Sequence, residues 1–194
     1  MAEIKSALEK ALEKIENLEK ASPEELKRLE YTPEGNAIAA RYLRGELTDI
    51  LAEFSKYDDD VRGYLTNGAF ETLLRNINLP KDSYTRQASN KAMEGILTLK
   101  ENKSAVKEID DQIQHLFTYY EGALQQTLTQ LKERFQGKLG EIKKSMEMQL
   151  GKKAEVKVEQ LPQFQEEWRR AVAGLDMQYE KVLEEHKQRI LNIT

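Results

Sequence analysis

The chain has 194 residues, of which 39% are hydrophobic and 33% are charged. This balance is apolar-poor for a compact globular domain and is typical of long helices that each bury a single stripe. The net charge of −4 does not favour binding of nucleic acid or anionic membranes, and the lack of cysteine excludes disulfides, thiolate metal sites and cysteine nucleophiles. Because the sequence has no apolar leader and no membrane-spanning run, we expect a cytoplasmic protein.

The first hundred residues predict about five short to medium helices. Residues 2–20 predict an amphipathic helix, and Ser22 with Glu25 forms a capping box that starts the second. Residues 32–34 repeat this start signal more weakly, opening a third helix whose apolar residues from 38 to 54 share one face. The apolar stripe of the first helix consists of Ile4, Leu8, Leu12, Ile15 and Leu18, widened by Ala7 and Ala11.

Two more helices are expected before residue 100. Residues 61–77 have helical periodicity, with a kink predicted at Asn67-Gly68 and a stop at Leu79-Pro80. A further helix is predicted from about Ser83 to Leu99. We therefore treat residues 1–100 as an N-terminal helical region.

The second half has an eleven-residue apolar repeat. Between Ser104 and Leu150 apolar residues recur at spacings of three, four and four, and residues 164–190 continue this interval. Eleven residues over three turns give about 3.67 residues per turn, which is typical of a nearly straight hendecad coiled coil. The predicted core positions are Ile113, Phe117, Tyr120, Leu124, Leu128, Leu131, Phe135, Leu139, Ile142, Met146, Leu150, Phe164, Trp168, Val172, Leu175, Tyr179, Leu183, His186 and Ile190.

Two matching stripes joined by a short connection predict an antiparallel helical hairpin over residues 101–194. Residues 154–159 alternate small or apolar with charged side chains, which indicates a short possible β segment at its tip. Counting outward from the turn pairs position 150 with 162 and position 120 with 192. This register leaves residues 106–118 to be covered by the first-half helices or another chain, and it places Phe135 near Met177 and Tyr179. The expected fold class is therefore all-α, with several short N-terminal helices before a long hairpin.

Few residues suggest a catalytic or metal-binding site. Asp58, Asp60 and Gly63 match three positions of a calcium loop, but Ala69 stands where a bidentate glutamate is needed, so an acidic helix N-terminus is the better interpretation. His186 is expected to be a core histidine near Leu124 or Leu128. No phosphate loop, metal-ligand spacing or nucleophile motif is present, so we expect no enzyme activity, no cofactor and no metal.

Two sets of residues could bind a partner. Tyrosines interleave with arginines in the first half, which could bind single-stranded nucleic acid or could simply line helix contacts. The tyrosine and arginine set is Tyr31, Tyr42, Tyr57, Tyr64, Tyr84, Arg41, Arg44, Arg62, Arg75 and Arg86. The hairpin tip is locally basic and is a candidate contact surface or a solvated turn. Its candidate residues are Lys143, Lys144, Met146, Met148, Lys152, Lys153 and Lys157.

Three segments carry a resemblance to known sequences. The opening residues 2–9, the cap at residues 22–25 and the closing helix from Trp168 to Ile190 resemble a group of uncharacterised, largely helical bacterial proteins. This resemblance implies a bacterial, cytoplasmic setting and no transferable activity. The order of helix, short β segment and helix is also similar to prefoldin-type chaperone hairpins.

The leading hypothesis is a non-enzymatic coiled-coil protein that forms a homodimer and uses its hairpin as a scaffold or adaptor arm for an unidentified protein. The alternative is a holdase-like chaperone or peripheral-stalk-like component that binds a larger machine through the lysine-rich tip. A third reading is an RNA-binding protein. No membrane partner is expected, and nucleic acid is disfavoured by the acidic net charge.

Overall fold

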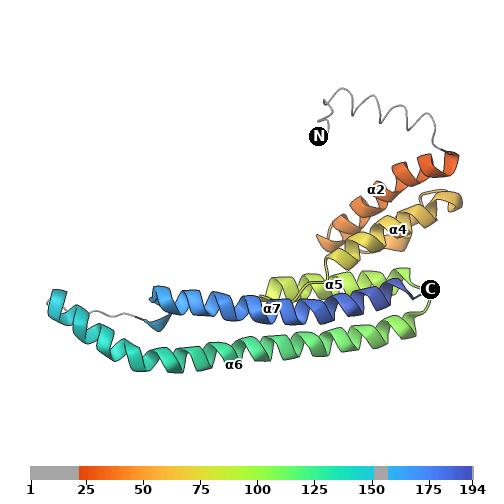
Figure 1. Cartoon of the computed structure of the whole chain (residues 1–194). Helices are drawn as coiled ribbons and strands as arrows, with labels where there is room; N and C mark the ends of the chain where they lie inside the picture. Colours follow the sequence, from red (N-terminus) through yellow and green to blue (C-terminus); the bar gives the residue numbers. More distant parts are fainter. Residues whose placement is uncertain (1–21, 151–156, 194) are drawn as a thin grey trace, which may run out of the picture. The chain divides into compact units, whose positions relative to one another are not determined.

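The computed structural model describes residues 22–150 and 157–193, without the side chains of residue 138 and residues 141–150. Every regular element in these ranges is helical, which confirms the predicted all-α class for them (Figure 1). Residues 2–20, where the sequence predicts an amphipathic helix, lie outside the described ranges. The elements are α2 (Pro23–Leu43), α3 (Ile50–Phe54), α4 (Asp59–Arg75), α5 (Ser83–Leu99), α6 (Lys103–Leu150), a 3-10 helix η1 (Val158–Gln160) and α7 (Pro162–Leu191).

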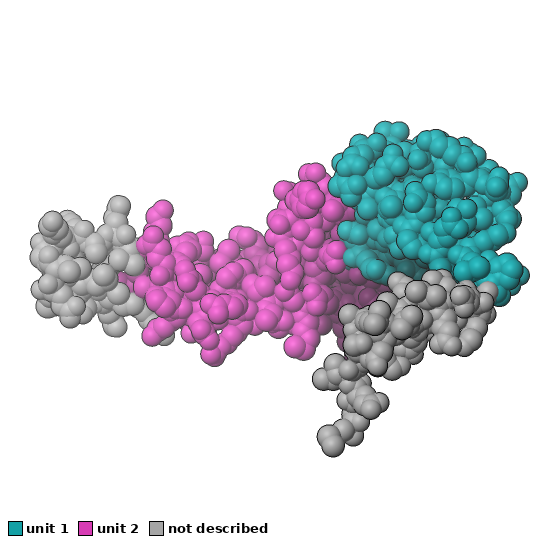
Figure 2. Space-filling model, turned by 90° about the horizontal axis from the view of Figure 1, so that it is seen from above, with its two compact units in different colours: residues 1–77, 90–101 teal, residues 78–89, 102–194 magenta. Residues whose placement is uncertain are grey.

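The chain divides into two compact units, which Figure 2 shows in separate colours. Unit 1 comprises residues 1–77 and 90–101, and unit 2 comprises residues 78–89 and 102–194. The division cuts α5, because its first turns belong to unit 2 and its later turns to unit 1. The sequence had grouped all of residues 1–100 together, whereas here residues 78–89 group with the long helices.

In unit 1, α2 and α4 pack with their backbones in contact. A Cβ atom on Gly35 would lie 2.1 Å from the carbonyl oxygen of Leu65, and one on Gly68 would lie 2.0 Å from that of Thr32. Glycine at both positions allows this approach, since no side chain separates the two helices. Helix α4 continues through Asn67-Gly68, where the sequence predicts a kink, and Gly68 lies at the contact with α2.

The boundaries of α2 confirm one prediction and correct another. Its capping box is present, with the Glu25 N–H donating to Ser22 Oγ at 3.2 Å and the Ser22 N–H donating to Glu25 Oε2 at 2.7 Å. The helix start predicted at residues 32–34 is wrong, because α2 runs through Pro33. Pro33 removes one backbone hydrogen bond, but the following turns bury Gly35 and Ile38, so packing holds the helix together.

The single helix expected over residues 38–54 is also wrong, because α2 ends at Leu43 and α3 starts at Ile50. Gly45 has a φ of 78°, a left-handed conformation that favours glycine. Its N–H donates to the Tyr42 carbonyl at 3.0 Å, and the Glu46 N–H donates to the Arg41 carbonyl at 3.0 Å. This pair of hydrogen bonds is a Schellman motif, which ends a helix.

In unit 2, α6 and α7 pack against each other in opposite directions. The Tyr120 ring of α6 lies 5.4 Å from that of Tyr179, and further along α6 the Phe135 ring lies 5.5 Å from that of Phe164. Because the partner's number falls as the number on α6 rises, the helices run antiparallel. Each ring pair meets edge to face, an arrangement that aromatic quadrupoles favour.

The predicted register between these helices is wrong. Tyr120 contacts Tyr179 rather than residue 192, Phe135 contacts Phe164, and Met177 is 74% exposed. The sequence argument assumed that both helices end together at the turn, whereas the last turns of α6 extend beyond the start of α7 (Figure 1). The C-terminal end of α7 consequently reaches Gln112, where Arg189 Nη1 donates to Oε1 at 2.5 Å.

The stretch from 106 to 118 was expected to be covered by the first-half helices or by another chain, and Val106, Ile109, Ile113 and Phe117 are buried within this chain. The described part of the possible β segment is not a strand, because η1 begins at Val158; residues 154–156 lie outside the described ranges. None of the described helices has the length and apolar content that crossing a membrane requires.

Candidate functional site

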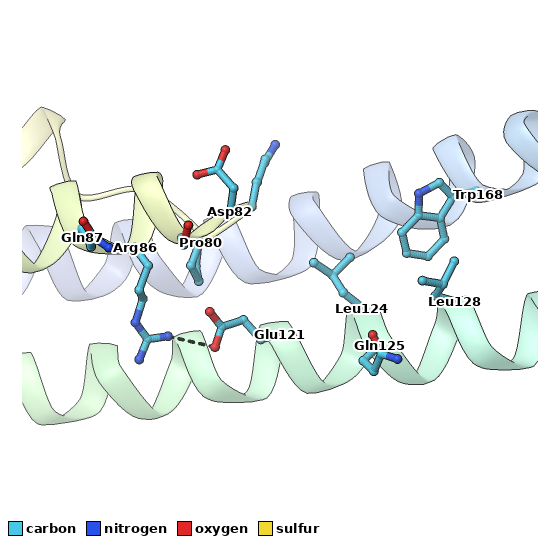
Figure 3. Close-up of a pocket in the computed structure, with 11 residues that line it drawn as sticks. Pro80, Asp82, Arg86, Gln87, Glu121, Leu124, Gln125, Leu128 and Trp168 are labelled. Carbon is cyan, nitrogen blue, oxygen red and sulfur yellow. Dashed lines mark hydrogen bonds and ion pairs between the residues drawn. The ribbon is translucent and has the colours of Figure 1, made fainter. Parts of the chain in front are cut away.

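An open groove of about 490 Å³ lies along α6 and α7 of unit 2. Leu124 and Leu128 of α6 and Trp168 of α7 form its apolar wall, and Figure 3 shows the two leucines pointing toward the indole ring. All three side chains are only partly buried, although each occupies a predicted core position. Residues 80–87 contribute a polar wall on the other side. The apolar stripe of the long helices is therefore open to solvent at this point.

The polar wall is fixed by local hydrogen bonds. The buried Ser89 hydroxyl accepts from the Asn78 N–H at 2.9 Å and donates to the Asn78 carbonyl at 3.0 Å. Asp82 caps α5 by accepting the Thr85 N–H at 2.7 Å, and hydrogen bonds from Thr85 lower the pKa of the Asp82 carboxyl. These bonds hold the segment before α5 in one conformation.

A partly buried acid joins this segment to both long helices. Lys81 Nζ donates to Asp176 Oδ2 at 2.7 Å, and the Tyr120 hydroxyl donates to Asp176 Oδ1 at 2.6 Å. Burial opposes ionisation of Asp176, but the hydrogen bonds from Lys81 and Tyr120 hold its pKa below the usual value. Burial, together with the neighbouring carboxylate, raises the pKa of Tyr120. The cluster thus contains a charged acid and a neutral phenol at pH 7.

Arg86 forms the second connection between α5 and α6. Its guanidinium donates to Glu121 Oε2 and to Gln114 Oε1, both at 3.1 Å, and lies 5.2 Å from the centre of the Phe117 ring. Figure 3 shows the bond to Glu121 at the edge of the groove. The charged groups of the polar wall are therefore used in contacts within unit 2.

Closed packing bounds the groove on both sides along α6 and α7. On one side, Ile113, Phe117 and Tyr120 are fully buried. On the other side a second apolar cluster contains Phe135 and Phe164, with Leu128 and Trp168 packed against it. Among the described residues, no buried side-chain nitrogen or oxygen lacks a hydrogen-bond partner. The apolar wall between these two packed regions can accept apolar side chains of another molecule.

The structure separates the predicted core positions into three groups. The buried positions are Ile113, Phe117, Tyr120, Leu131, Phe135, Phe164, Leu183 and Ile190. The partly buried positions are Leu124, Leu128, Leu139, Trp168, Val172, Leu175, Tyr179 and His186. The side chains of Ile142, Met146 and Leu150 lie outside the described residues.

Most of the predicted basic tip lies outside the described residues. The side chains of Lys143, Lys144, Met146 and Met148, and the whole of Lys152 and Lys153, lie outside the described residues. Lys157 is described and exposed. Its backbone N–H donates to Oε1 of Gln160, the last residue of η1, at 3.1 Å.

The calcium-loop positions fall at a helix start. Asp58 is the N-cap of α4, Asp60 accepts from Lys27 Nζ at 2.5 Å, and Gly63 lies within the helix. These residues do not surround a common point. No group of three or more histidines and carboxylates in the described ranges could hold a metal ion.

The two histidines lie apart from the groove. His115 is exposed, whereas His186 is partly buried with its ring nitrogen 3.3 Å from Arg189 Nη1. The expected position of His186 near Leu124 or Leu128 depended on the wrong register. Burial, followed by the charge of Arg189, lowers the pKa of His186.

Sequence reasoning missed the Lys81 and Asp176 connection. A signal was present, because Asp176 stands four residues after Val172 and three before Tyr179. That spacing places a carboxylate on the apolar stripe of α7, where a charge needs a partner. Nothing in the sequence identified Lys81 as that partner.

Comparison with known proteins gives one match. The family of unknown function DUF6657 matches residues 51–192, a range that includes α4 to α7 and the groove. Neither a curated protein nor a solved structure matches the chain. The match agrees with the expectation of a group without transferable activity.

Proposed function

The chain belongs to the family of unknown function DUF6657, and we propose that it is a non-enzymatic helical protein that self-associates and binds other proteins. The observation that carries this proposal is the open apolar groove at Leu124, Leu128 and Trp168. Apolar surface of this kind gains free energy when another protein covers it. The charged groups around it, Lys81, Asp82, Arg86 and Glu121, already form hydrogen bonds or ion pairs within unit 2, so we expect binding there to depend mainly on shape and apolar area.

In this proposal α6 and α7 form a hendecad coiled-coil hairpin that acts as a rigid arm. The antiparallel contacts of Tyr120 with Tyr179 and of Phe135 with Phe164 support it. An ion pair of 2.7 Å between Lys132 and Glu159 adds a polar contact beside the second ring pair. A rigid arm presents the groove in a fixed shape, which lowers the entropy cost of binding.

The favoured occupant of the groove is a helix of a second copy, which would give a homodimer. Where α5 contributes its first turns, the stripe on α6 is closed by side chains such as Arg86. Beyond that segment Leu124 and Leu128 remain partly exposed. A third helix placed over these leucines would complete the packing that α5 provides earlier along the arm.

The experiment uses Trp168, which is the single tryptophan of the sequence and lines the groove. Sedimentation equilibrium and tryptophan emission are measured on the full chain from submicromolar to high micromolar concentration. We expect the mass to rise to that of a dimer while the emission shifts to shorter wavelength, because the indole becomes less exposed to water. A monomer mass at every concentration contradicts the homodimer.

A matched pair of variants tests whether the groove is the interface. Leu128→Glu places a charge on its apolar wall, whereas Gln125→Glu places the same charge on an exposed polar position of the same helix. We expect Leu128→Glu to weaken association roughly tenfold or more, as burying a leucine is worth about 1.5 to 3 kcal/mol. Equal effects of the two variants would place the interface elsewhere. Circular dichroism establishes that both variants remain helical.

The chaperone or stalk alternative depends on the lysine-rich tip, of which the structure describes only Lys157 as an exposed side chain. It makes a separate experimental claim, since a holdase suppresses aggregation of an unfolded test protein. Suppression by the wild-type chain, lost when the tip lysines are changed to glutamine, would favour it over the groove proposal. No suppression would leave the interaction arm as the better account.

The RNA-binding reading is weakened by the contacts of its arginines. Each of the five interleaved arginines already pairs with a carboxylate: Arg41 with Glu53, Arg44 with Glu46, Arg62 with Asp59, Arg75 with Glu71 and Arg86 with Glu121. Tyr42 is also buried, so it cannot stack on a base. A filter-binding titration with single-stranded RNA should show no retention at physiological salt.

A further inference from the structure

Helix α2 carries an apolar stripe on each of two opposite faces. One face is buried in unit 1 through Gly35, Ile38, Ala39 and Tyr42. The other holds Leu26, which is 42% exposed, and Leu29, which is 59% exposed. Exposed Pro33 and Ala37 continue this second stripe toward the end of the helix. At about 3.6 residues per turn, these four positions share one face that lies roughly half a turn away from the buried Gly35.

A surface helix normally carries polar side chains on the face away from the core. Here the outer positions 26, 29, 33 and 37 are all apolar, while the charged residues Glu30 and Glu34 lie beside them. Two leucines that are about half exposed on consecutive turns form a surface that gains free energy when it is covered. We therefore expect another segment to pack on this outer stripe.

The chain itself contains a segment that fits. Residues 1–21 end directly at Ser22, the N-cap of α2, so a helix preceding Ser22 needs only a short loop to return along α2. The sequence of this segment has apolar residues alternately three and four positions apart, which is helical spacing. These residues are Ile4, Leu8, Ala11, Ile15 and Leu18.

The two stripes match when they are counted outward from the loop. Positions four before and four after Ser22 are Leu18 and Leu26, and positions seven before and seven after are Ile15 and Leu29. The next pairs along the stripes are Ala11 with Pro33, each eleven positions from Ser22, and Leu8 with Ala37, fourteen positions before and fifteen after it. We propose that residues 2–20 form a helix that lies antiparallel on the outer face of α2 in the same chain. This interaction concerns unit 1 and does not rest on the proposed function of the groove.

Disulfide crosslinking tests this pairing cleanly, because the natural sequence has no cysteine. The test chain carries Ile15→Cys with Leu29→Cys, two positions that the proposal places opposite each other. The control carries Ile15→Cys with Arg28→Cys, which changes the exposed neighbour of Leu29 on α2. Leu29 is itself exposed, so its replacement leaves the described core of unit 1 intact. Both full-length chains are oxidised at low concentration as mixtures of isotope-labelled and unlabelled protein.

We expect the test pair to form its disulfide within one chain, at least severalfold faster than the control pair, because a disulfide requires Cα atoms within about 7 Å. Mass spectrometry after trypsin then finds the peptide that begins at position 15 linked to the one that begins at position 29, with both peptides carrying the same isotope label. Equal rates for the two chains would overturn the proposal. Linkage of labelled to unlabelled peptide would also overturn it, because the stripe would then be covered by a second copy.

Discussion

Replacing Phe135 with alanine should destabilise unit 2 strongly. Phe135 is 1% exposed and lies in an apolar cluster with Leu131, Val158 and Phe164. Its ring meets that of Phe164 edge to face, with an interplanar angle of 86°. The substitution removes the ring from α6 while its partners from η1 and α7 remain in place.

The expected cost follows from these contacts. Truncation of a buried phenylalanine to alanine typically costs about 3 to 5 kcal/mol, and an edge-to-face ring contact accounts for roughly 0.5 to 1.5 kcal/mol of such a loss. The cluster is small and lies near the end of the paired helices, so partial collapse around the cavity should keep the cost near 3 kcal/mol. That is a large share of a typical domain stability of about 5 to 15 kcal/mol.

Urea denaturation of the full chain provides the measurement. Trp168 packs against the same cluster, so its emission reports on unit 2 even where the two units unfold separately. The unfolding midpoint should fall by roughly 1 to 3 M urea. Gln136→Ala, at the exposed next position of α6, should change stability by less than about 0.5 kcal/mol. Equal losses, or a greater loss at Gln136, would refute the eleven-residue assignment.

Three further predictions concern single contacts. Gly68→Ala places a Cβ 2.0 Å from the Thr32 carbonyl oxygen and should lower the stability of the protein by about 2 to 3 kcal/mol or more. The added Cβ of Gly63→Ala has no atom within 4 Å, so this variant should stabilise α4 by roughly 0.5 to 1 kcal/mol. Thermal denaturation measures both changes. Asp176→Asn should cost about 1 to 3 kcal/mol at pH 7. Because the folded chain lowers the pKa of Asp176, this cost should shrink below about pH 4. Burial lowers the pKa of His186, so the free energy of unfolding should fall as the pH drops below about 6.5. The His186→Gln variant should lose less stability over the same pH range.

Local signals in the sequence predicted the helices well where they act within a few residues. The capping box of Ser22 and Glu25 identifies the start of α2, since both partners lie in one turn. The uninterrupted apolar periodicity from Ser104 onward likewise identifies α6. These features depend on neighbouring side chains and on the helix repeat, both of which can be read directly from a sequence.

Signals that depend on distant packing were misread. Pro33 looked like a helix start, but α2 continues through it because the next turns pack on α4. Gly68 was interpreted only as a kink position, whereas it lies where the backbone of Thr32 approaches. In both cases a tertiary contact decided the role of a residue whose local preference pointed elsewhere. Gly45, which was not recognised as a stop, ends α2 through its positive φ.

The register of the long helices shows why the groove itself could not be predicted. An eleven-residue repeat places the same kind of apolar face at every interval, so a shift of one repeat leaves the pattern nearly unchanged. What distinguishes one register from another is a small number of polar contacts, such as Tyr120 with Asp176 and Arg189 with Gln112. The same contacts fix which part of the stripe lies beside residues 80–87 and which part stays open. The groove at Leu124 and Leu128 is therefore a consequence of these polar contacts acting on a repetitive apolar pattern, and changing Asp176 tests the register as well as the stability.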